Sequence, residues 1–87
     1  MNYDFTDGLK KDLLKLKKKD LETYRAIKKK IKEIVNSGNI EHYKNLRAPS
    51  QHLKGVHIRK SFVLVFEYYK KKNKIMFVDF DHHDKIY

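Results

Sequence analysis

The chain has 87 residues, of which 21 are Lys or Arg and 11 are Asp or Glu, so its formal net charge is +10. This length predicts a single domain over residues 1–87, and the absence of cysteine excludes disulfides and thiolate chemistry. No apolar run approaches the roughly 20 residues that span a bilayer, so we expect a cytoplasmic protein without a membrane partner. The positive charge favours nucleic acid or an acidic protein as the partner.

The first part of the chain predicts a short strand followed by two helices. Residues 2–5 alternate between polar and aromatic side chains, which is compatible with an edge strand. A first helix, capped by Thr6 or Asp7, is followed by a second helix that Asp20 caps and that ends at residues 37–38. The short separation between the two helices predicts an antiparallel hairpin.

The second part of the chain predicts three antiparallel strands. Residues 39–51 have no clear period and contain the only proline, which favours a connecting loop. Strands are expected over residues 56–59, 62–69 and 75–80. The middle strand is apolar on both sides and is therefore expected at the centre of the sheet. The predicted fold is α+β, with the N-terminal strand and helix hairpin packed on a small antiparallel sheet whose other face is open and concave.

Several residues that can carry chemistry converge on the open face of this predicted sheet. His57 and Arg59 alternate with core-facing aliphatic residues, so they share the opposite strand face at a separation of about 7 Å. His83 and Tyr87 are four residues apart, and one helical turn or a tight turn brings them to one side. With Lys54, these groups supply what metal-free RNA cleavage requires: a base, a cation and an acid.

Simpler explanations compete with this one. A single histidine is more often a surface residue than a catalyst, the lysines of the two helices are typical of a solvated face, and the lysines at 70–72 are typical of a hairpin tip. Residues 81–83 resemble the DHH signature of metal-dependent phosphoesterases, but those enzymes need further aspartates on a larger scaffold. No metal site or cofactor is therefore predicted. Glycine-rich nucleotide loops and an RNP-type aromatic motif are absent from the sequence.

Three stretches of the second half carry a resemblance to a known family. Their sequences are HLKGVHIR (52–59), SFVLVF (61–66) and DHHDKIY (81–87). Together they resemble the RelE/YafQ-type toxins of type II toxin–antitoxin modules, within the RelE/ParE superfamily. The detailed resemblance covers roughly residues 43–87, whereas the helix hairpin matches only in architecture and size.

The resemblance implies a microbial-RNase-like domain that inhibits translation by cleaving mRNA without a metal, in the ribosomal A site. Its products would be a 2′,3′-cyclic phosphate and a 5′-hydroxyl, and an acidic, RelB-like antitoxin would wrap the toxin. The catalytic positions that the resemblance implies are His57, Arg59, His83 and Tyr87. The substrate-binding positions that it implies are His52, Lys54, Asp84 and Lys85.

The sequence departs from the family pattern at two positions. Many members carry aspartate where this chain has Ser61, and arginine where it has Val63, which leaves Arg59 and Lys54 as the expected cations for transition-state charge. Two alternatives stay open. One is a ParE-type toxin that inhibits DNA gyrase and does not need the histidines, and the other is a non-catalytic basic module that binds RNA or the ribosome.

Overall fold

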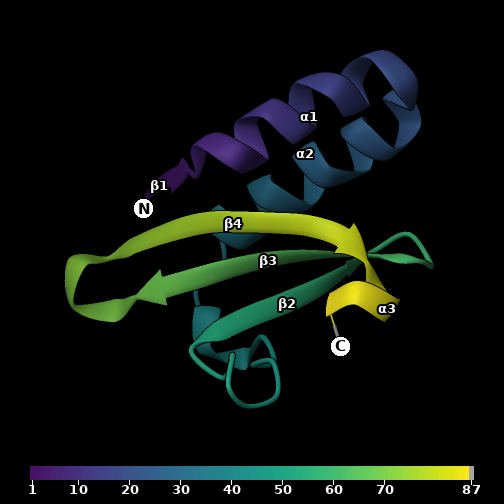
Figure 1. The fold of residues 1–87 in the computed structure, drawn as a ribbon. Helices are drawn as coiled ribbons and strands as arrows, with labels where there is room; N and C mark the ends of the chain where they lie inside the picture. The colour runs from purple at the N-terminus through teal and green to yellow at the C-terminus, as the bar shows by residue number, and fades with distance from the viewer. Residues whose placement is uncertain (87) are drawn as a thin grey trace.

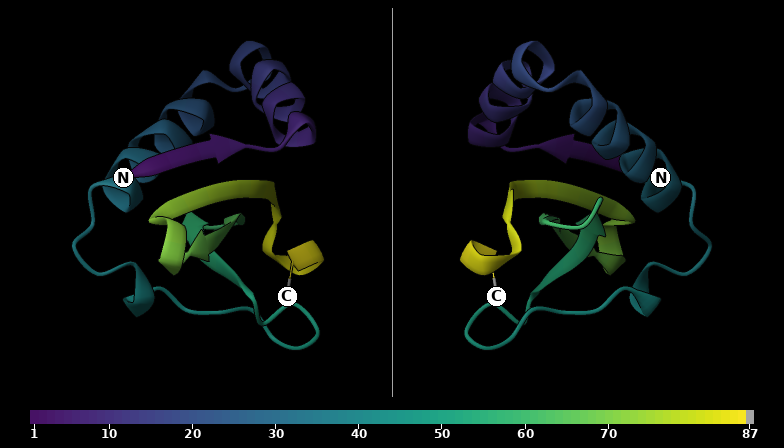
Figure 2. Two further views of the ribbon diagram at one scale, coloured as in Figure 1. Left: turned by 90° about the vertical axis from the view of Figure 1, so that its left-hand side faces the viewer. Right: turned by 90° about the vertical axis from the view of Figure 1, so that its right-hand side faces the viewer.

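The computed structural model describes residues 1–86, which form a mixed sheet with helices on both of its faces (Figure 1). The elements are β1 (Asn2–Phe5), α1 (Asp7–Lys19), α2 (Leu21–Val35), β2 (Leu53–Ile58), β3 (Phe62–Tyr69), β4 (Lys74–His82) and α3 (His83–Ile86). Figure 2 shows the two long helices on one side of the sheet, and the short α3 with part of the connection before β2 on the other side. No helix in the described part of the chain is long and apolar enough to cross a bilayer.

The helix hairpin forms where the capping residues predict it. The hydroxyl oxygen of Thr6 accepts a hydrogen bond from the backbone N–H of Leu9 at 3.3 Å, which caps the first turn of α1. Asp20 is the single residue between α1 and α2, and its carboxylate accepts the backbone N–H of Thr23 at 3.2 Å. The predicted hairpin and both of its caps are therefore confirmed.

The sheet has the strand order β1-β4-β3-β2. The β2–β3 and β3–β4 pairs are antiparallel, as predicted, and β3 lies at the centre. The short strand expected at residues 2–5 is confirmed as the edge strand β1; it pairs with β4 in parallel, which makes the sheet mixed. The rings of Phe5 and Tyr3 lie 5.3 and 6.2 Å from the ring of Phe77, and these contacts hold β1 beside β4.

Two strands are longer than the apolar pattern indicates. β2 begins at Leu53 because its pairing with β3 extends to Glu67, and β4 continues to His82, which pairs with Phe62. The connection before β2 also contains more structure than the aperiodic sequence predicts. It includes a 3-10 turn at Ile40–His42 whose first side chain is buried.

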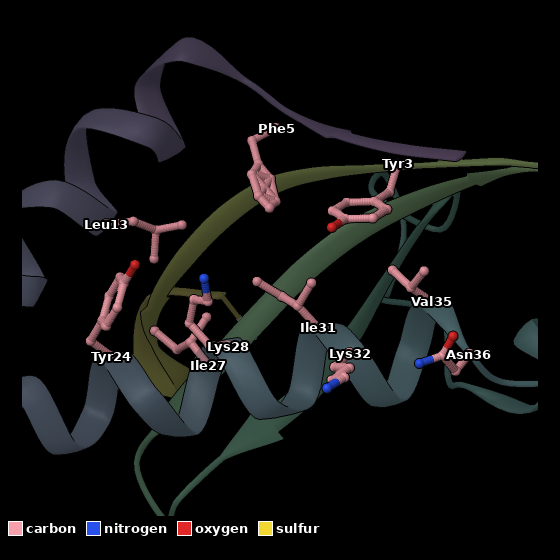
Figure 3. A pocket seen from close by; sticks show the side chains of 10 residues that line it. All are labelled: Tyr3, Phe5, Leu13, Tyr24, Ile27, Lys28, Ile31, Lys32, Val35 and Asn36. Carbon is pink, nitrogen blue, oxygen red and sulfur yellow. The ribbon is translucent and has the colours of Figure 1, made fainter. Parts of the chain in front are cut away.

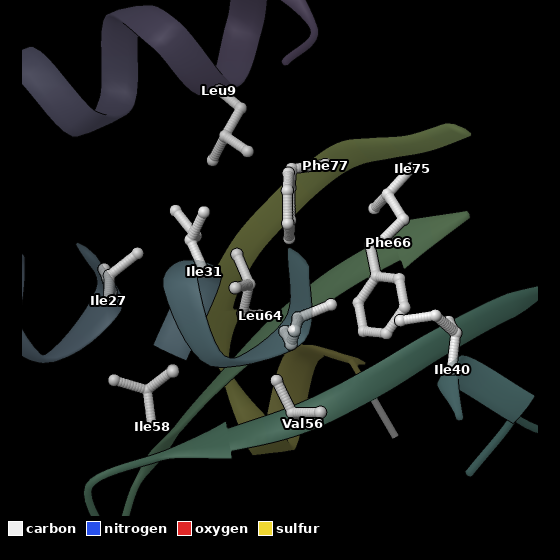
Figure 4. Close-up of a cluster of buried hydrophobic side chains, with 11 residues drawn as sticks. Leu9, Ile27, Ile31, Ile40, Val56, Ile58, Leu64, Phe66, Ile75 and Phe77 are labelled. Carbon is white, nitrogen blue, oxygen red and sulfur yellow. The ribbon is translucent and has the colours of Figure 1, made fainter. Parts of the chain in front are cut away.

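The sheet has apolar clusters on both of its faces. The larger cluster lies between the helix hairpin and the sheet (Figure 4). Its buried members are Leu9, Ile27, Ile31, Ile34, Ile40, Val56, Ile58, Leu64, Phe66, Ile75 and Phe77. The second cluster, on the opposite face, has Leu46, Val63 and Val65 at its centre, with Leu53, Val78 and Ile86 packed around them. The face that was expected to be open is therefore partly covered by the residue 43–52 connection and by α3.

Candidate functional site

The concave face of the sheet carries a cleft between α3 and the connection that precedes β2. Its volume is about 390 Å³, and we name it the α3 cleft. The residues that line it are Leu46, Ser50, Leu53, Val65, Val78, Asp79, Lys85 and Ile86. The apolar members Leu46, Leu53, Val65, Val78 and Ile86 all belong to the second cluster, which forms the floor of the cleft.

His57 lies on this concave face, as the sequence predicts. It is exposed on β2 and pairs with Val63, a member of the second cluster, which in turn pairs with Asp81 on β4. Directly opposed residues of antiparallel strands share a face, so His57 and Asp81 occupy one row across the sheet. The two strand spacings between them correspond to about 10 Å.

His83 lies at the same end of the sheet. It begins α3, and its backbone N–H donates a hydrogen bond of 2.9 Å to the carbonyl oxygen of Ser61, in the turn between β2 and β3. The His83 Nδ1 atom is 3.1 Å from the Asp84 carboxylate, and the two side chains are 48% and 86% exposed. The Asp84 carboxylate is thus within hydrogen-bonding distance of one nitrogen of the His83 ring.

The polar wall of the α3 cleft brings together residues that are distant in sequence. Lys85, one of the predicted site residues, lines it together with Ser50 and Asp79. Neither Ser50 nor Asp79 was a candidate from the sequence. Asp79 could have been inferred from the alternation of side chains along β4, because it lies two residues before Asp81 and therefore on the same face. No such pattern includes Ser50, which belongs to an aperiodic loop.

Two further predicted residues lie at the margin of this region. His52 is exposed in the same connection, two residues after Ser50. Tyr87 lies outside the described residues. Within residues 1–86, no three His, Asp or Glu side chains gather in a way that could hold a metal ion.

Arg59 does not share the concave face with His57, so that expectation is wrong. β2 ends at Ile58, and Arg59 adopts the left-handed conformation (φ 57°) in the following turn, where strand alternation no longer applies. Its Nη1 atom donates a hydrogen bond of 3.0 Å to the Thr23 hydroxyl, and Nη2 is 3.8 Å from the Glu22 carboxylate. Both His57 and Arg59 border a shallow cleft of about 250 Å³ beside α2. The Arg59 guanidinium is held there by its hydrogen bond to Thr23, in the first turn of that helix.

Lys54 is also placed differently from the expectation. It follows the alternation of Val56 and therefore projects from the helix-facing side of β2, where it is only 8% exposed. Its ammonium donates hydrogen bonds of 2.9 Å to the Tyr43 carbonyl oxygen and 3.0 Å to Asn45 Oδ1. A buried ammonium needs such acceptors, and here they attach the connecting segment to β2.

The Arg59 guanidinium belongs to a hydrogen-bonded network at the start of α2. Thr23 is 1% exposed, and its hydroxyl accepts from Arg59 while donating to Asp20 Oδ2 at 2.6 Å. The hydrogen bonds from the Thr23 hydroxyl and backbone N–H lower the pKa of Asp20 below its ordinary value of 3.8. Through the turn that contains Ser61, this network connects the helix hairpin to the backbone of His83.

Comparison with known proteins identifies the class to which this fold and site belong. No protein-family model matches the chain. A protein of Methanocaldococcus jannaschii described as "Putative toxin RelE4" is 53% identical over 80 residues, which are 92% of this chain and 83% of that protein. The chain belongs to the RelE family of toxins, which confirms the resemblance seen in its sequence.

Solved structures of such toxins share the fold. The YoeB-YefM complex from Staphylococcus aureus matches with a TM-score of 0.76 at 17% identity, covering 95% of this chain and 97% of that one. The isolated E. coli RelE toxin matches with a TM-score of 0.73 at 23% identity, covering 93% of this chain and 82% of that one. The predicted α+β, RelE-like fold class is thereby confirmed.

The network at the start of α2 predicts a coupled loss of stability. Thr23→Val keeps the shape of the side chain but removes one donor and one acceptor, so the free energy of unfolding should fall by about 1–3 kcal/mol in urea denaturation. The double variant Thr23→Val with Arg59→Met should lose less free energy of unfolding than the sum of the losses of the two single variants, by about 0.5 kcal/mol or more. Strictly additive losses would show that the two side chains do not interact.

The lowered pKa of Asp20 predicts acid sensitivity. Because the folded pKa lies below 3.8, the stabilisation is complete above that pH and is lost as the pH falls through the folded value. Asp20→Asn should therefore destabilise the protein more at pH 7 than at pH 2, as measured by denaturation at both pH values. An equal difference at the two pH values would contradict this assignment.

Proposed function

We propose that this protein is the toxin of a type II toxin–antitoxin module and acts as a metal-independent endoribonuclease on mRNA. The observation that carries the proposal is that His57, on the concave face of β2, and His83, at the start of α3, lie at the same end of the sheet. The neighbouring α3 cleft adds Lys85, and membership of the RelE family supports the same activity. The site supplies two imidazole groups, each able to give or to accept a proton, and one cation.

The proposed chemistry is the cleavage of RNA by attack of the 2′-hydroxyl next to the broken bond, which requires a base and an acid. One histidine removes the proton of the 2′-hydroxyl, whose oxygen attacks phosphorus, and the other protonates the 5′-oxygen as the P–O bond breaks. The products are a 2′,3′-cyclic phosphate and a 5′-hydroxyl. Asp84 lies beside the His83 ring, with its carboxylate 3.1 Å from Nδ1, and is proposed to orient that ring toward the substrate.

Lys85 is the proposed source of positive charge for the phosphorane. Lys54 is buried against the connection and Arg59 is bonded to Thr23, so neither faces the α3 cleft. Val63 is fully buried and cannot replace the arginine that many family members have at that position. Catalysis here rests mainly on histidine, with Tyr87 proposed to orient or stack the substrate.

The proposed partners are mRNA in the ribosomal A site and an acidic, RelB-like antitoxin in the cytoplasm. The net charge of +10 favours contact with ribosomal RNA and with an acidic protein. The YoeB structure that matches this fold is a complex with YefM, which supports a protein partner for this chain as well.

Removal of either histidine tests the proposed mechanism. His57→Ala and His83→Ala should each slow mRNA cleavage by about 10²–10⁴, because each removes an acid–base group. Primer extension on mRNA, with and without ribosomes, measures the rate. His42→Ala is the matched control, since His42 is exposed in the turn at Ile40–His42, and its neighbours Ile40 and Tyr43 belong to the apolar cluster on the helix side of the sheet.

Three results would contradict the mechanism. Folded variants that cleave as fast as the wild type would exclude the histidines from catalysis. Wild-type protein that binds RNA in a salt-sensitive manner without a cleavage product would be a non-catalytic binding module. Inhibition of gyrase supercoiling without mRNA cleavage would indicate a ParE-type toxin.

A cellular assay tests His83 and Tyr87 together. Expression of the wild-type protein should arrest growth, and the double variant His83→Ala with Tyr87→Phe should relieve the arrest. Immunoblotting establishes equal protein levels. Full toxicity of the folded double variant would exclude both residues from the activity.

A further inference from the structure

The turn between β2 and β3 connects the two histidines of the proposed mechanism. It comprises residues 59–61, between the end of β2 and the start of β3, and we name it the 59–61 turn. His57 stands two residues before it, and the backbone N–H of His83 donates a hydrogen bond of 2.9 Å to the carbonyl oxygen of Ser61 within it. The position of this turn therefore determines where the backbone of both histidines lies.

Aromatic contacts join the same turn to the end of β4. Phe62, the first residue after the turn, pairs with His82, and the centres of their rings are 4.5 Å apart. The Phe62 ring also stacks on the ring of Phe80, at 5.0 Å and an interplanar angle of 19°. Since His82 directly precedes His83, a displacement of the turn would move the start of α3 with it.

The backbone of the turn adopts a conformation that arginine does not favour. Arg59 has a φ of 57°, in the left-handed region, where residues other than glycine are uncommon. Asparagine and aspartate enter this region more easily than other residues do. Such a conformation persists where the surrounding structure holds it. The contacts of the Arg59 side chain meet this requirement.

The Arg59 guanidinium attaches the turn to the junction of the two long helices. Its acceptor, the Thr23 hydroxyl, is 3.0 Å from Nη1 and belongs to a residue that is 1% exposed. That hydroxyl donates to the Asp20 carboxylate at 2.6 Å, and the backbone N–H of Asp20 donates to the Leu16 carbonyl oxygen at 2.7 Å. The turn is thus tied to both α1 and α2 through a buried group.

A direct contact of Arg59 with the substrate fits this arrangement less well. Both terminal nitrogens face acceptors of α2, since Nη2 is 3.8 Å from the Glu22 carboxylate. A phosphate would have to displace these acceptors, and the buried Thr23 hydroxyl would then lose the donor from which it accepts. The contacts of Arg59 therefore favour a role that acts through the backbone of the turn.

We propose that Thr23 and Arg59 are positioning residues, which hold the 59–61 turn so that His57 and His83 stand at the separation that the reaction requires. This inference rests on the proposed function, because it takes these two histidines as the acid–base pair. In this role neither Thr23 nor Arg59 touches the reacting atoms. Their effect on the rate comes from the placement of groups that do, and a displacement of about 1 Å can cost about 10²-fold in rate.

A groove elsewhere on the helix side offers a control for loss of stability alone (Figure 3). It lies between β1 and α2, has a volume of about 560 Å³, and is bordered by Lys28 and Lys32. The side chains that form its apolar surface are Tyr3, Phe5, Leu13, Tyr24, Ile31 and Val35. Ile31 is 7% exposed and lies two turns after Thr23 on α2, about 12 Å along the helix. Ile31→Val therefore weakens the core at a distance from the network.

The first measurement follows the turn itself, by amide hydrogen exchange in NMR spectra of the whole protein. Thr23→Val keeps the shape of the side chain without its hydroxyl, and Arg59→Asn keeps a residue that accepts the left-handed backbone without the guanidinium. In both variants the His83 N–H should exchange at least about tenfold faster relative to the amides of β3. Ile31→Val should leave this ratio unchanged. Because Arg59 is exposed, Arg59→Asn provides the test even if Thr23→Val does not fold.

The second measurement is the rate of mRNA cleavage by primer extension, at saturating and at limiting mRNA. Thr23→Val and Arg59→Asn should each lower the rate at saturation by about tenfold, while the half-saturating concentration changes by less than about twofold. Thr23→Ser, which keeps the hydroxyl, should cleave mRNA and exchange the His83 N–H as the wild type does. Ile31→Val should also cleave at the rate of the wild type.

Four results would overturn the inference. An unchanged His83 exchange ratio in the folded variants would show that the network does not hold the turn. Equal losses of rate in Thr23→Ser and Thr23→Val would assign the effect to packing instead of the hydroxyl. A raised half-saturating concentration at an unchanged maximal rate would make Arg59 a substrate contact. A similar loss of rate in Ile31→Val would attribute the effect to stability alone.

Failure of the proposed function itself would look different. Wild-type protein that does not cleave mRNA would refute the ribonuclease, and with it any role of the network in that reaction. The exchange ratios of the variants do not depend on cleavage, so they still show whether Thr23 and Arg59 hold the turn.

Discussion

The architecture depends on the burial of β3 on both of its faces. Leu64 and Phe66 project toward the helix hairpin, and Val63 and Val65 project toward the concave face, all at 2% exposure or less. A central strand of this kind requires cover on both sides of the sheet. The long helices cover one side, but only α3 and a short connection are available for the other. The incomplete cover on that second side leaves the α3 cleft open, and it leaves His57 exposed on the same face.

Local signals in the sequence predicted those elements that local interactions form. The caps at Thr6 and Asp20, the hairpin and the central strand all follow from spacing within a few residues. The side chains of Lys54 and Arg59 were misplaced because the limits of β2 depend on its pairing with β3, which apolar alternation does not reveal. Ser50 became a candidate only in the fold, since its neighbours in the cleft come from β4 and α3.

Positive charge has three different roles in this chain. The Lys54 ammonium holds the connection to β2, and the Arg59 guanidinium joins the turn after β2 to the start of α2, so both are structural in the contacts they make. Lys85 faces the α3 cleft, and Lys28 and Lys32 border the groove on the helix side. Net charge alone indicates an anionic partner, but the direction in which each cation points determines which surface that partner meets.

The sheet separates two surfaces that contain almost none of the same residues. The groove is built from β1, α1 and α2, whereas the α3 cleft is built from the other face of the sheet and the segments that cover it. A substitution on one of these two surfaces therefore leaves the side chains of the other in place. Such a division allows the helix side and the concave side of the sheet to change independently of each other in evolution.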